Sequence, residues 1–200
     1  MNYLAHAALA EPSDEARLGA ILGDFARGLD EAKLPEDTRY ALLEHRALDR
    51  WFDAREDVRA ARAWFPPELR RFAGILIDVF VDHVLAREWR TLGPAPLTDV
   101  SGSLYRSFET YAHLLPPRLA EVGPRMASQD WLGGYGDRDN IGRALAGIER
   151  RMRRDTGLTA GIAVLDSHAE PLHELTLRAV PEAFDWASTR RALDGRAPAG

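Results

Sequence analysis

ILIDVFVDHVLAREW, residues 75–89, is the stretch that decides the fold. Apolar side chains fill most of it, and they are interrupted by Asp78 and Asp82, four positions apart, and by His83. Residues four apart lie on the same face of a helix. A carboxylate is rarely buried unless it is paired or binds a metal ion. The stretch therefore predicts a buried helix whose acidic face needs a cation.

A second acidic stripe lies in EHRALDRWFD, residues 44–53, where His45, Asp49 and Asp53 follow at intervals of four. The same helical spacing predicts that they share one face. Asp53 also has an ordinary explanation, which is an ion pair with Arg50, Arg55 or another nearby arginine.

Two further polar residues interrupt apolar stretches near the start of the chain. His6 lies in a short expected helix over residues 2–10, and Asp24 lies near the end of one over residues 13–28. A single buried histidine is usually a hydrogen-bonded core residue, and a single aspartate is usually a cap or an ion-pair partner. Together with the two stripes, however, they predict one site shared by four helices.

Helical periodicity dominates the remaining chain, and we find no strand pattern or internal repeat. Proline and glycine mark the expected breaks, and Pro171 is expected to kink a long helix over residues 160–180. Pro181 is expected to begin a last helix. The prediction is an all-α fold: a single compact multi-helix domain over residues 1–194, followed by a flexible tail over residues 195–200. The expected helices cover residues 2–10, 13–28, 34–52, 57–65, 68–89, 98–115, 117–126, 137–154, 160–180 and 181–193.

Composition limits the classes of function. The chain has 200 residues, 46% of them hydrophobic, with a formal net charge of −5, so bulk charge does not favour nucleic acid as a partner. It has no cysteine, which excludes disulfides, thiolate zinc sites and a cysteine nucleophile. No signal-peptide pattern and no run of about 20 apolar residues occurs, so we expect a cytoplasmic protein without a membrane partner.

The candidate ligands are imidazoles and carboxylates without thiolates. Such a set suits manganese, magnesium, iron(II) or catalytic zinc. Metal sites of this kind lower the pKa of bound water and neutralise charge on a phosphoryl group, so metal-assisted hydrolysis of a phosphate ester is the leading class. The Glu-x-x-His spacing of diiron bundles is absent, which disfavours oxygen chemistry.

The chain resembles the acyl carrier protein phosphodiesterases in an ordered set of motifs. These are MNYLAHAALA (1–10), LGAILGDFARG (18–28), EHRALDRWFD (44–53), RRFAGILIDVFVDHVLAREW (70–89), SLYRSFETYAHLLPPRL (103–119) and QDWLGGYGDRDNIGRALAGIERRMRR (129–154). The resemblance implies cleavage of the phosphodiester that joins 4'-phosphopantetheine to a serine of holo acyl carrier protein. It also implies an HD-like helical fold, similar to the HD-domain metal phosphohydrolases, and a divalent metal. Manganese is the expected ion, with magnesium, iron(II) or zinc as alternatives.

The resemblance implies that the residues at positions matching the family's motifs bind the metal ion or take part in catalysis. Asp24, Asp82 and His83 are the expected catalytic residues, with His83 as a proton relay. The family often has Thr-Asp and then His-Pro after the second stripe; here Phe52 precedes Asp53, so Asp53 is left out of the predicted site. The expected metal ligands are His6, Asp24, His45, Asp49, Asp78 and Asp82.

An acidic acyl carrier protein as the partner needs basic residues on this acidic chain. Arg27, Arg46 and Arg50 are the expected substrate-binding residues, since guanidinium groups bind phosphate in a bidentate way. The alternative for such charge runs is a solvated helix face. Two groups are candidates for docking the carrier: Arg46, Arg50, Arg55, Arg59 and Arg62, and the cluster Arg150, Arg151, Arg153 and Arg154.

Two other functions stay open at this point. One is an HD-like phosphohydrolase that acts on a nucleotide or another small phosphoester. The other is a non-catalytic helical module that binds a carrier protein, and it predicts that arginines engage the acidic residues. The oligomeric state does not follow from the sequence.

Overall fold

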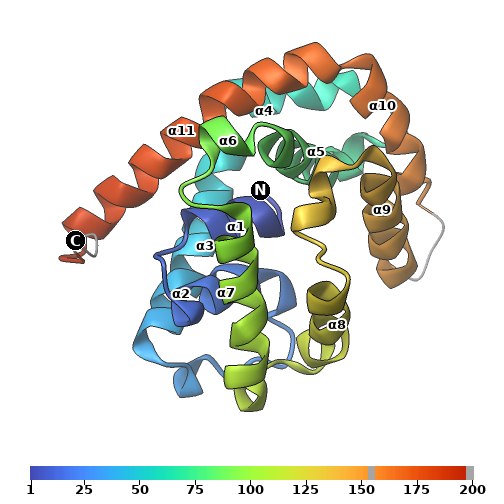
Figure 1. Ribbon diagram of the computed structural model, residues 1–200. Coiled ribbons are helices and arrows are strands. Elements are labelled where there is room, and N and C mark those ends of the chain that lie inside the picture. Colours follow the sequence, from blue (N-terminus) through green and yellow to red (C-terminus); the bar gives the residue numbers. More distant parts are fainter. Residues whose placement is uncertain (153–155, 197–200) are drawn as a thin grey trace.

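The acidic apolar stretch forms α5 (Ala73–Arg87), a helix near the centre of the computed structural model (Figure 1). Ten of its residues are buried, including Asp82 and His83. It begins later than residue 68, because residues 66–69 form a turn after Pro66 and a short 3-10 helix (Arg70–Phe72) leads into α5. The structure describes residues 1–152 and 156–196.

The first helix, α1 (Tyr3–Leu9), is buried on all sides. Its residues are almost wholly apolar, so no face of it favours contact with water. It packs against α2 (Asp14–Leu22), α5, α7 (Leu97–Thr110) and α11 (Ala169–Leu193). The N-terminus therefore lies in the middle of the molecule (Figure 1).

The helices α2 and α3 (Glu36–Ala54) form the closest pair in the fold. Ser13 caps α2, because its Oγ accepts a hydrogen bond from the Ala16 N–H at 3.1 Å. Gly19 allows the close approach, since a Cβ atom there would overlap the carbonyl oxygen of Thr38. This packing sets His45 and Asp49 of α3 beside the end of α2.

The remaining helices lie around this centre. They are α4 (Glu56–Ala61), α6 (Trp89–Leu92), α8 (Pro117–Ser128), α9 (Arg138–Met152) and α10 (Ile162–Ser167). Helix α8 packs against α7, α4 against α3, and α6 and α9 against α5, while α10 precedes and contacts α11. The described residues also contain seven short 3-10 helices and no strand, so the all-α prediction is confirmed. Six of these seven are η1 (Gly23–Phe25), η2 (Glu31–Lys33), η3 (Arg62–Trp64), η5 (Ala112–Leu114), η6 (Gly133–Gly136) and η7 (Leu158–Gly161).

The prediction of a kink at Pro171 and of a new helix at Pro181 is wrong. The break comes at His168, between α10 and α11, and α11 then runs without interruption through Pro181. Pro171 is the third residue of α11, where a backbone N–H has no partner inside the helix. Pro181 is accommodated because the carbonyl that it leaves unpaired belongs to the exposed Leu177.

Several expected boundaries shift or lie outside the described residues. The helix expected over 98–115 ends at Thr110 and is followed by η5. Arg153, Arg154 and residues 197–200 of the expected tail lie outside the described ranges, whereas Arg196 forms an ion pair with Asp37. No helix over residues 1–152 and 156–196 combines the length and the apolar character needed to cross a bilayer.

Candidate functional site

His6, His45 and Asp49 converge from α1 and α3. The Nε2 atom of His6 lies 3.0 Å from Asp49 Oδ1, and the Nε2 atom of His45 lies 3.2 Å from Asp49 Oδ2. The two imidazole rings stack with their centroids 3.8 Å apart. One potential ligand atom from each residue lies within 4.8 Å of the others, so the three side chains can share one cation.

A backbone carbonyl fixes the orientation of the His45 ring. Its Nδ1 donates a hydrogen bond of 2.6 Å to the Ala20 carbonyl, which can only accept. In the neutral ring, Nε2 therefore carries a lone pair and faces the Asp49 carboxylate. A backbone carbonyl that holds the far nitrogen of an imidazole is typical of metal-binding histidines. Gly23 leaves room for this ring, because a Cβ atom there would overlap it.

The cluster has strongly shifted pKa values. Burial and the neighbouring His45 lower the pKa of His6 to about 3, so His6 is neutral at pH 7. Burial acts to raise the pKa of Asp49, but the hydrogen bonds from His45 and His6 hold it well below its usual range. Burial likewise acts to lower the pKa of His45, and the bond to Asp49 and the charges of Asp49 and Asp24 raise it overall.

A positive charge already lies between two of the carboxylates. The Met1 ammonium group is 2.8 Å from Asp78 Oδ1 and 3.4 Å from Asp49 Oδ1. Burial acts to lower its pKa, but Asp78 and Asp49 raise it to about 10. Both carboxylates keep about a third of their side-chain surface, 30% for Asp78 and 37% for Asp49. The acidic face of α5 thus meets a cation at a point where both carboxylates are partly exposed to solvent, and we call the surroundings of Asp49, Asp78 and the Met1 ammonium group the recess.

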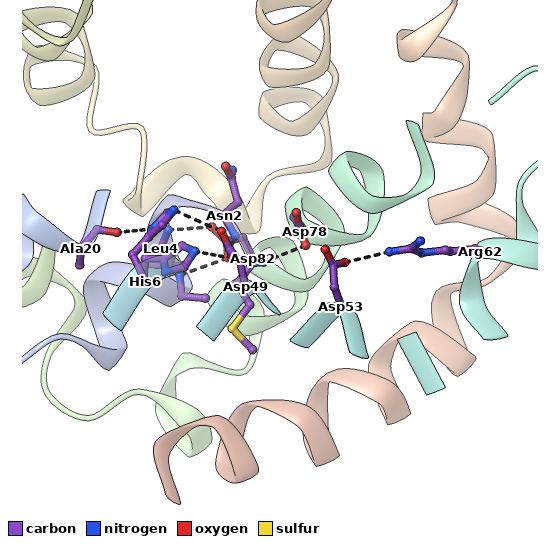
Figure 2. A network of polar contacts seen from close by, with 12 residues as sticks. Asn2, Leu4, His6, Ala20, Asp49, Asp53, Arg62, Asp78 and Asp82 are labelled. Carbon is purple, nitrogen blue, oxygen red and sulfur yellow. Dashed lines mark hydrogen bonds and ion pairs between the residues drawn. The ribbon is translucent and has the colours of Figure 1, made fainter. Parts of the chain in front are cut away.

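Asp82 has a different set of partners. Its carboxylate is fully buried and accepts hydrogen bonds from the backbone N–H groups of Asn2, Leu4 and Ala5, at 3.3, 2.7 and 3.1 Å (Figure 2). Burial raises its pKa to about 7 against the effect of these donors. These N–H groups begin α1, so Asp82 caps the helix that carries His6. Its role as a metal ligand stays a prediction.

Asp24 lies in η1, directly after α2. Its side chain is exposed, yet the surrounding protein raises its pKa to about 6, with smaller effects from His45 and Asp49. Both observations fit a carboxylate on the wall of the recess, open on one side and enclosed on the others. No described residue forms an ion pair or hydrogen bond with it. Its oxygens are therefore available to a cation or to substrate.

His83 does not join this group. One position after Asp82, it projects from another face of α5, where its Nδ1 donates a hydrogen bond of 2.8 Å to the Tyr135 carbonyl. It lines a separate cavity of about 480 Å³ together with Glu88, Arg138 and His173. The structure thus brings together six of the predicted residues around the recess and places His83 elsewhere.

The predicted substrate-binding arginines differ in whether a carboxylate is paired with them. Arg46 forms a bidentate pair with Glu31, at 2.6 and 3.1 Å. Arg27 and Arg50 are exposed, and no carboxylate of the described residues pairs with them. Asp53 pairs with Arg62 at 2.9 Å, as the ordinary explanation proposed.

Some residues near the recess were not identified from the sequence. The pKa of Tyr3 rises to about 12 because of burial and the Asp24 charge, and Arg151 and Arg118 act against this rise. Phe25, next to Asp24 in the chain, stacks on Tyr3 with ring centroids 5.7 Å apart, Arg118 lies 5.4 Å over the Phe25 ring, and Arg151 lines a cavity together with Tyr3. Tyr3 also lines a second cavity, of about 600 Å³, between the end of α8, η6 and α9. No local pattern identified Tyr3 or Arg118, because nothing in the spacing connects α1 with α8.

Four arginines lie around this second cavity, and we call them the arginine rim: Arg125, Arg143, Arg150 and Arg151. Arg143 bonds to the Asn140 side chain. No carboxylate within the described ranges pairs with the other three. By contrast, Arg46, Arg55 and Arg62 of the other candidate docking group are all paired with carboxylates. The rim is the larger unpaired basic surface of the two.

The fold and the recess define an all-α protein with a central site built from imidazole and carboxylate side chains. The family model described as acyl carrier protein phosphodiesterase matches residues 1–183. Acyl carrier protein phosphodiesterases of Salmonella agona and Salmonella typhimurium are each 35% identical to the chain over 194 residues, which are 96% of this chain and 100% of theirs. The chain belongs to the acyl carrier protein phosphodiesterase family. No solved structure matches it significantly, so the HD-like fold stays a prediction.

Proposed function

We propose that the protein is a metal-dependent phosphodiesterase that acts on holo acyl carrier protein. Water would cleave the bond between phosphorus and the serine oxygen, which gives apo carrier protein and free 4'-phosphopantetheine. The observation that carries this proposal is the convergence of His6, His45 and Asp49 on one point. The family membership supplies the substrate.

The donor atoms at this point fit a divalent cation. His45 Nε2 lies 3.2 Å from Asp49 Oδ2, and His6, which is neutral at pH 7, has its Nε2 3.0 Å from Asp49 Oδ1. His6, His45 and Asp49 would hold the ion, with the exposed Asp24 and the partly exposed Asp78 beside them. Bound there, a divalent cation supplies a water of lowered pKa and neutralises charge on the phosphoryl group. Manganese is our proposed ion, with magnesium, iron(II) and zinc as alternatives.

Asp24 is the proposed proton acceptor at this site. Its pKa of about 6 suits a general base that works near neutral pH. It is open to the recess and has no partner among the described residues. The attacking water would lose its proton to the Asp24 carboxylate, and the serine oxygen of the carrier, as its bond to phosphorus breaks, would take up a proton from solvent water. His83 is less well placed, since it lies on another face of α5.

The arginine rim is the proposed docking surface for the acidic carrier protein. Guanidinium groups around the second cavity that have no carboxylate partner can steer and orient an acidic partner. Arg151 and Arg118 also lie near Tyr3 and Asp24, so they are suitable partners for the phosphodiester oxygens. We therefore propose Arg118 and Arg151 as the phosphate ligands in place of Arg46, because the Arg46 guanidinium group already forms an ion pair with Glu31.

The observed ion pairs argue against a non-catalytic binding module. That function predicted arginines on the acidic residues of the stripes. Instead, Asp49 contacts two imidazoles and an ammonium group, Asp78 contacts the same ammonium group, and Asp82 accepts backbone N–H groups. A binding surface has no need for such a set of acceptors.

Mass spectrometry of holo carrier protein, incubated with the protein and manganese, tests the proposal. We expect the carrier to lose its phosphopantetheinyl group. The Asp49→Asn variant should release none, whereas Asp53→Asn, which changes a carboxylate paired with Arg62, should act as the wild-type protein does. An intact carrier with the wild-type protein, together with turnover of a nucleotide panel, would favour the small-phosphoester alternative.

A further inference from the structure

The second cavity has a composition that suits a small-molecule chain. Its volume is about 600 Å³, within the range of ordinary ligand pockets. Aromatic and aliphatic residues form much of its wall: Tyr3, Trp131, Tyr135, Ala144 and Ile148. Such a cavity is too small for a helix of another protein, but it is large enough for an extended chain of about 20 heavy atoms.

Side-chain amides supply hydrogen-bonding groups along the same cavity. Asn2, Gln129 and Asn140 all line it. The Asn2 amide donates to the Tyr135 hydroxyl at 2.9 Å, and the Asn140 amide donates to the Gly134 carbonyl at 3.0 Å. The Asn2 carbonyl oxygen is free to accept from a ligand N–H. Those of Gln129 and Asn140 already accept from Trp131 Nε1–H and from Arg143, and each keeps a second lone pair. The wall thus offers apolar surface and neutral polar groups, and the arginine rim and Asp130 lie around them.

The cavity begins next to the catalytic recess. Asn2 and Tyr3 line it, and the same short segment leads into α1, which carries His6 one turn later. Asn2 N–H bonds to Asp82, and Tyr3 is close to Asp24. A substrate whose phosphate lies at the recess can therefore extend a substituent past Tyr3 into the cavity.

The cavity beside His83 has a different chemistry. Its wall has no Phe, Tyr or Trp side chain, and it carries Arg87 and Glu170 besides two ion pairs, Arg138 with Asp166 at 2.5 Å and His173 with Glu88 at 3.2 Å. Placing a neutral chain there would desolvate charges without replacing their hydrogen bonds. This cavity is therefore a poor site for an uncharged, amide-containing substituent.

We propose that the cavity between η6 and α9 is the subsite for the pantetheine arm of the substrate, which is a neutral chain with two amide groups and a terminal thiol. This inference rests on the proposed function. The apolar wall would contact the methylene groups of the arm, and the side-chain amides would meet its amide groups. Carrier proteins that present the serine phosphate without this arm would be poor substrates.

Gly147 offers a direct test, because it lines the cavity from α9. A Cβ atom there would meet only the far end of Arg150, at 3.8 Å, so Gly147→Phe adds a ring to the cavity without a backbone clash. Glycine is also a poor helix former, so the change does not oppose α9. Gly142→Phe is the matched control. It lies on the same helix, has no atom within 4 Å of a Cβ, and lines neither cavity.

Two measurements on the whole protein decide the matter. The first is NMR or calorimetric titration with pantetheine, without metal. We expect saturable binding to the wild type and to Gly142→Phe, and loss of binding in Gly147→Phe. The second is hydrolysis, with manganese, of holo carrier protein and of bis(p-nitrophenyl) phosphate, which has no arm. Gly147→Phe should lower kcat/KM for the carrier at least about tenfold more than for the small diester.

The outcomes separate this inference from the proposed function. Equal pantetheine binding by the wild type and Gly147→Phe would overturn the subsite, even if holo carrier protein is hydrolysed. Absence of pantetheine binding to the wild type would overturn it as well. If the wild type binds pantetheine in a Gly147-dependent way but leaves holo carrier protein intact, the subsite stands and the proposed hydrolysis is wrong.

Discussion

At the scale of single residues, the site depends on Asp49. Its two oxygens contact His6, His45 and the Met1 ammonium group, which come from parts of the chain up to 48 positions apart. Three positive or proton-bearing partners around one carboxylate hold its pKa well below the usual range. Asp49 thus stays ionised at any physiological pH and keeps its lone pairs directed at the point where His6 and His45 meet.

Metal binding should release protons in acidic buffer. The hydrogen bond from His45 to Asp49 raises the pKa of His45, so the metal-free protein carries a proton on His45 at pH 6. An imidazole that binds a metal ion must be neutral, so this proton has to leave. Manganese affinity should therefore rise with pH, by at most about tenfold per unit for each proton. Calorimetry at pH 6 in two buffers of different ionisation enthalpy counts the protons.

The Asp24→Asn variant isolates the share of His45 in this release. Asp24 has a pKa of about 6 and holds part of a proton at this pH. The variant should still release close to one proton per manganese ion. Binding without proton release, in both the wild type and the variant, would show that His45 is not a ligand.

Asp82 and Asp24 should respond to mutation in opposite ways. Asp82→Ala leaves three buried N–H groups of α1 without an acceptor, each worth about 1–3 kcal/mol, and removes a desolvated carboxylate in partial compensation. We expect a loss of about 2 kcal/mol or more in the free energy of unfolding, measured with urea and EDTA at pH 7. Asp24 is exposed, so Asp24→Ala should change the free energy of unfolding by no more than about 0.5 kcal/mol, but it should abolish hydrolysis. Equal stability of the two variants would contradict the capping role of Asp82.

At the scale of elements, α1 and α5 hold the site together, and α11 covers them (Figure 1). Asp82 joins α5 to α1, and Arg191 joins α11 to α3 through Glu44 at 2.6 Å. Arg191 also donates to the Leu9 carbonyl at the end of α1. Both ends of α1 are thus fixed by charged groups from other helices, so the position of His6 is set by the packing of three elements.

The uninterrupted α11 predicts opposite roles for its two prolines. Pro181→Ala should restore a hydrogen bond to the Leu177 carbonyl and raise the free energy of unfolding by about 2 kcal/mol, since proline costs about 3 kcal/mol in a helix interior and saves up to about 1 through the unfolded chain. Pro171→Ala, in the first turn, should change it by no more than about 0.5 kcal/mol. Thermal and urea unfolding measure both. Stabilisation by the Pro171 change alone would place the kink where the sequence had predicted it.

At the scale of the whole molecule, the charges are unevenly arranged. The chain carries a formal charge of −5, yet the arginine rim around the second cavity lacks carboxylate partners among the described residues. About half of the other described arginines form ion pairs, such as Arg55 with Asp57 and Glu182. An acidic carrier would therefore be attracted to one face of an acidic protein.

Charge reversal on the rim should weaken carrier binding. In the double variant Arg125→Glu and Arg150→Glu, KM for holo carrier protein should rise about tenfold at low salt, and kcat should change much less, because such contacts act mainly on encounter. The difference from the wild type should shrink as salt screens it. Arg59→Glu on α4 is the control, since Arg59 is exposed and belongs to the other candidate group. A larger effect from Arg59→Glu would place docking on that group.

Local patterns in the sequence were sufficient for the class of fold and for part of the site. Helical spacing and apolar runs depend only on near neighbours, so they determined the all-α fold, the buried acidic α5 and the stripe of His45 and Asp49. His6 could be added because it interrupts an apolar helix. Contacts between distant segments follow from packing, and only the tertiary structure decided them. It turned His83 away from Asp82, gave Asp82 the N–H groups of α1, placed the Met1 ammonium group between Asp49 and Asp78, and left the arginine rim unpaired.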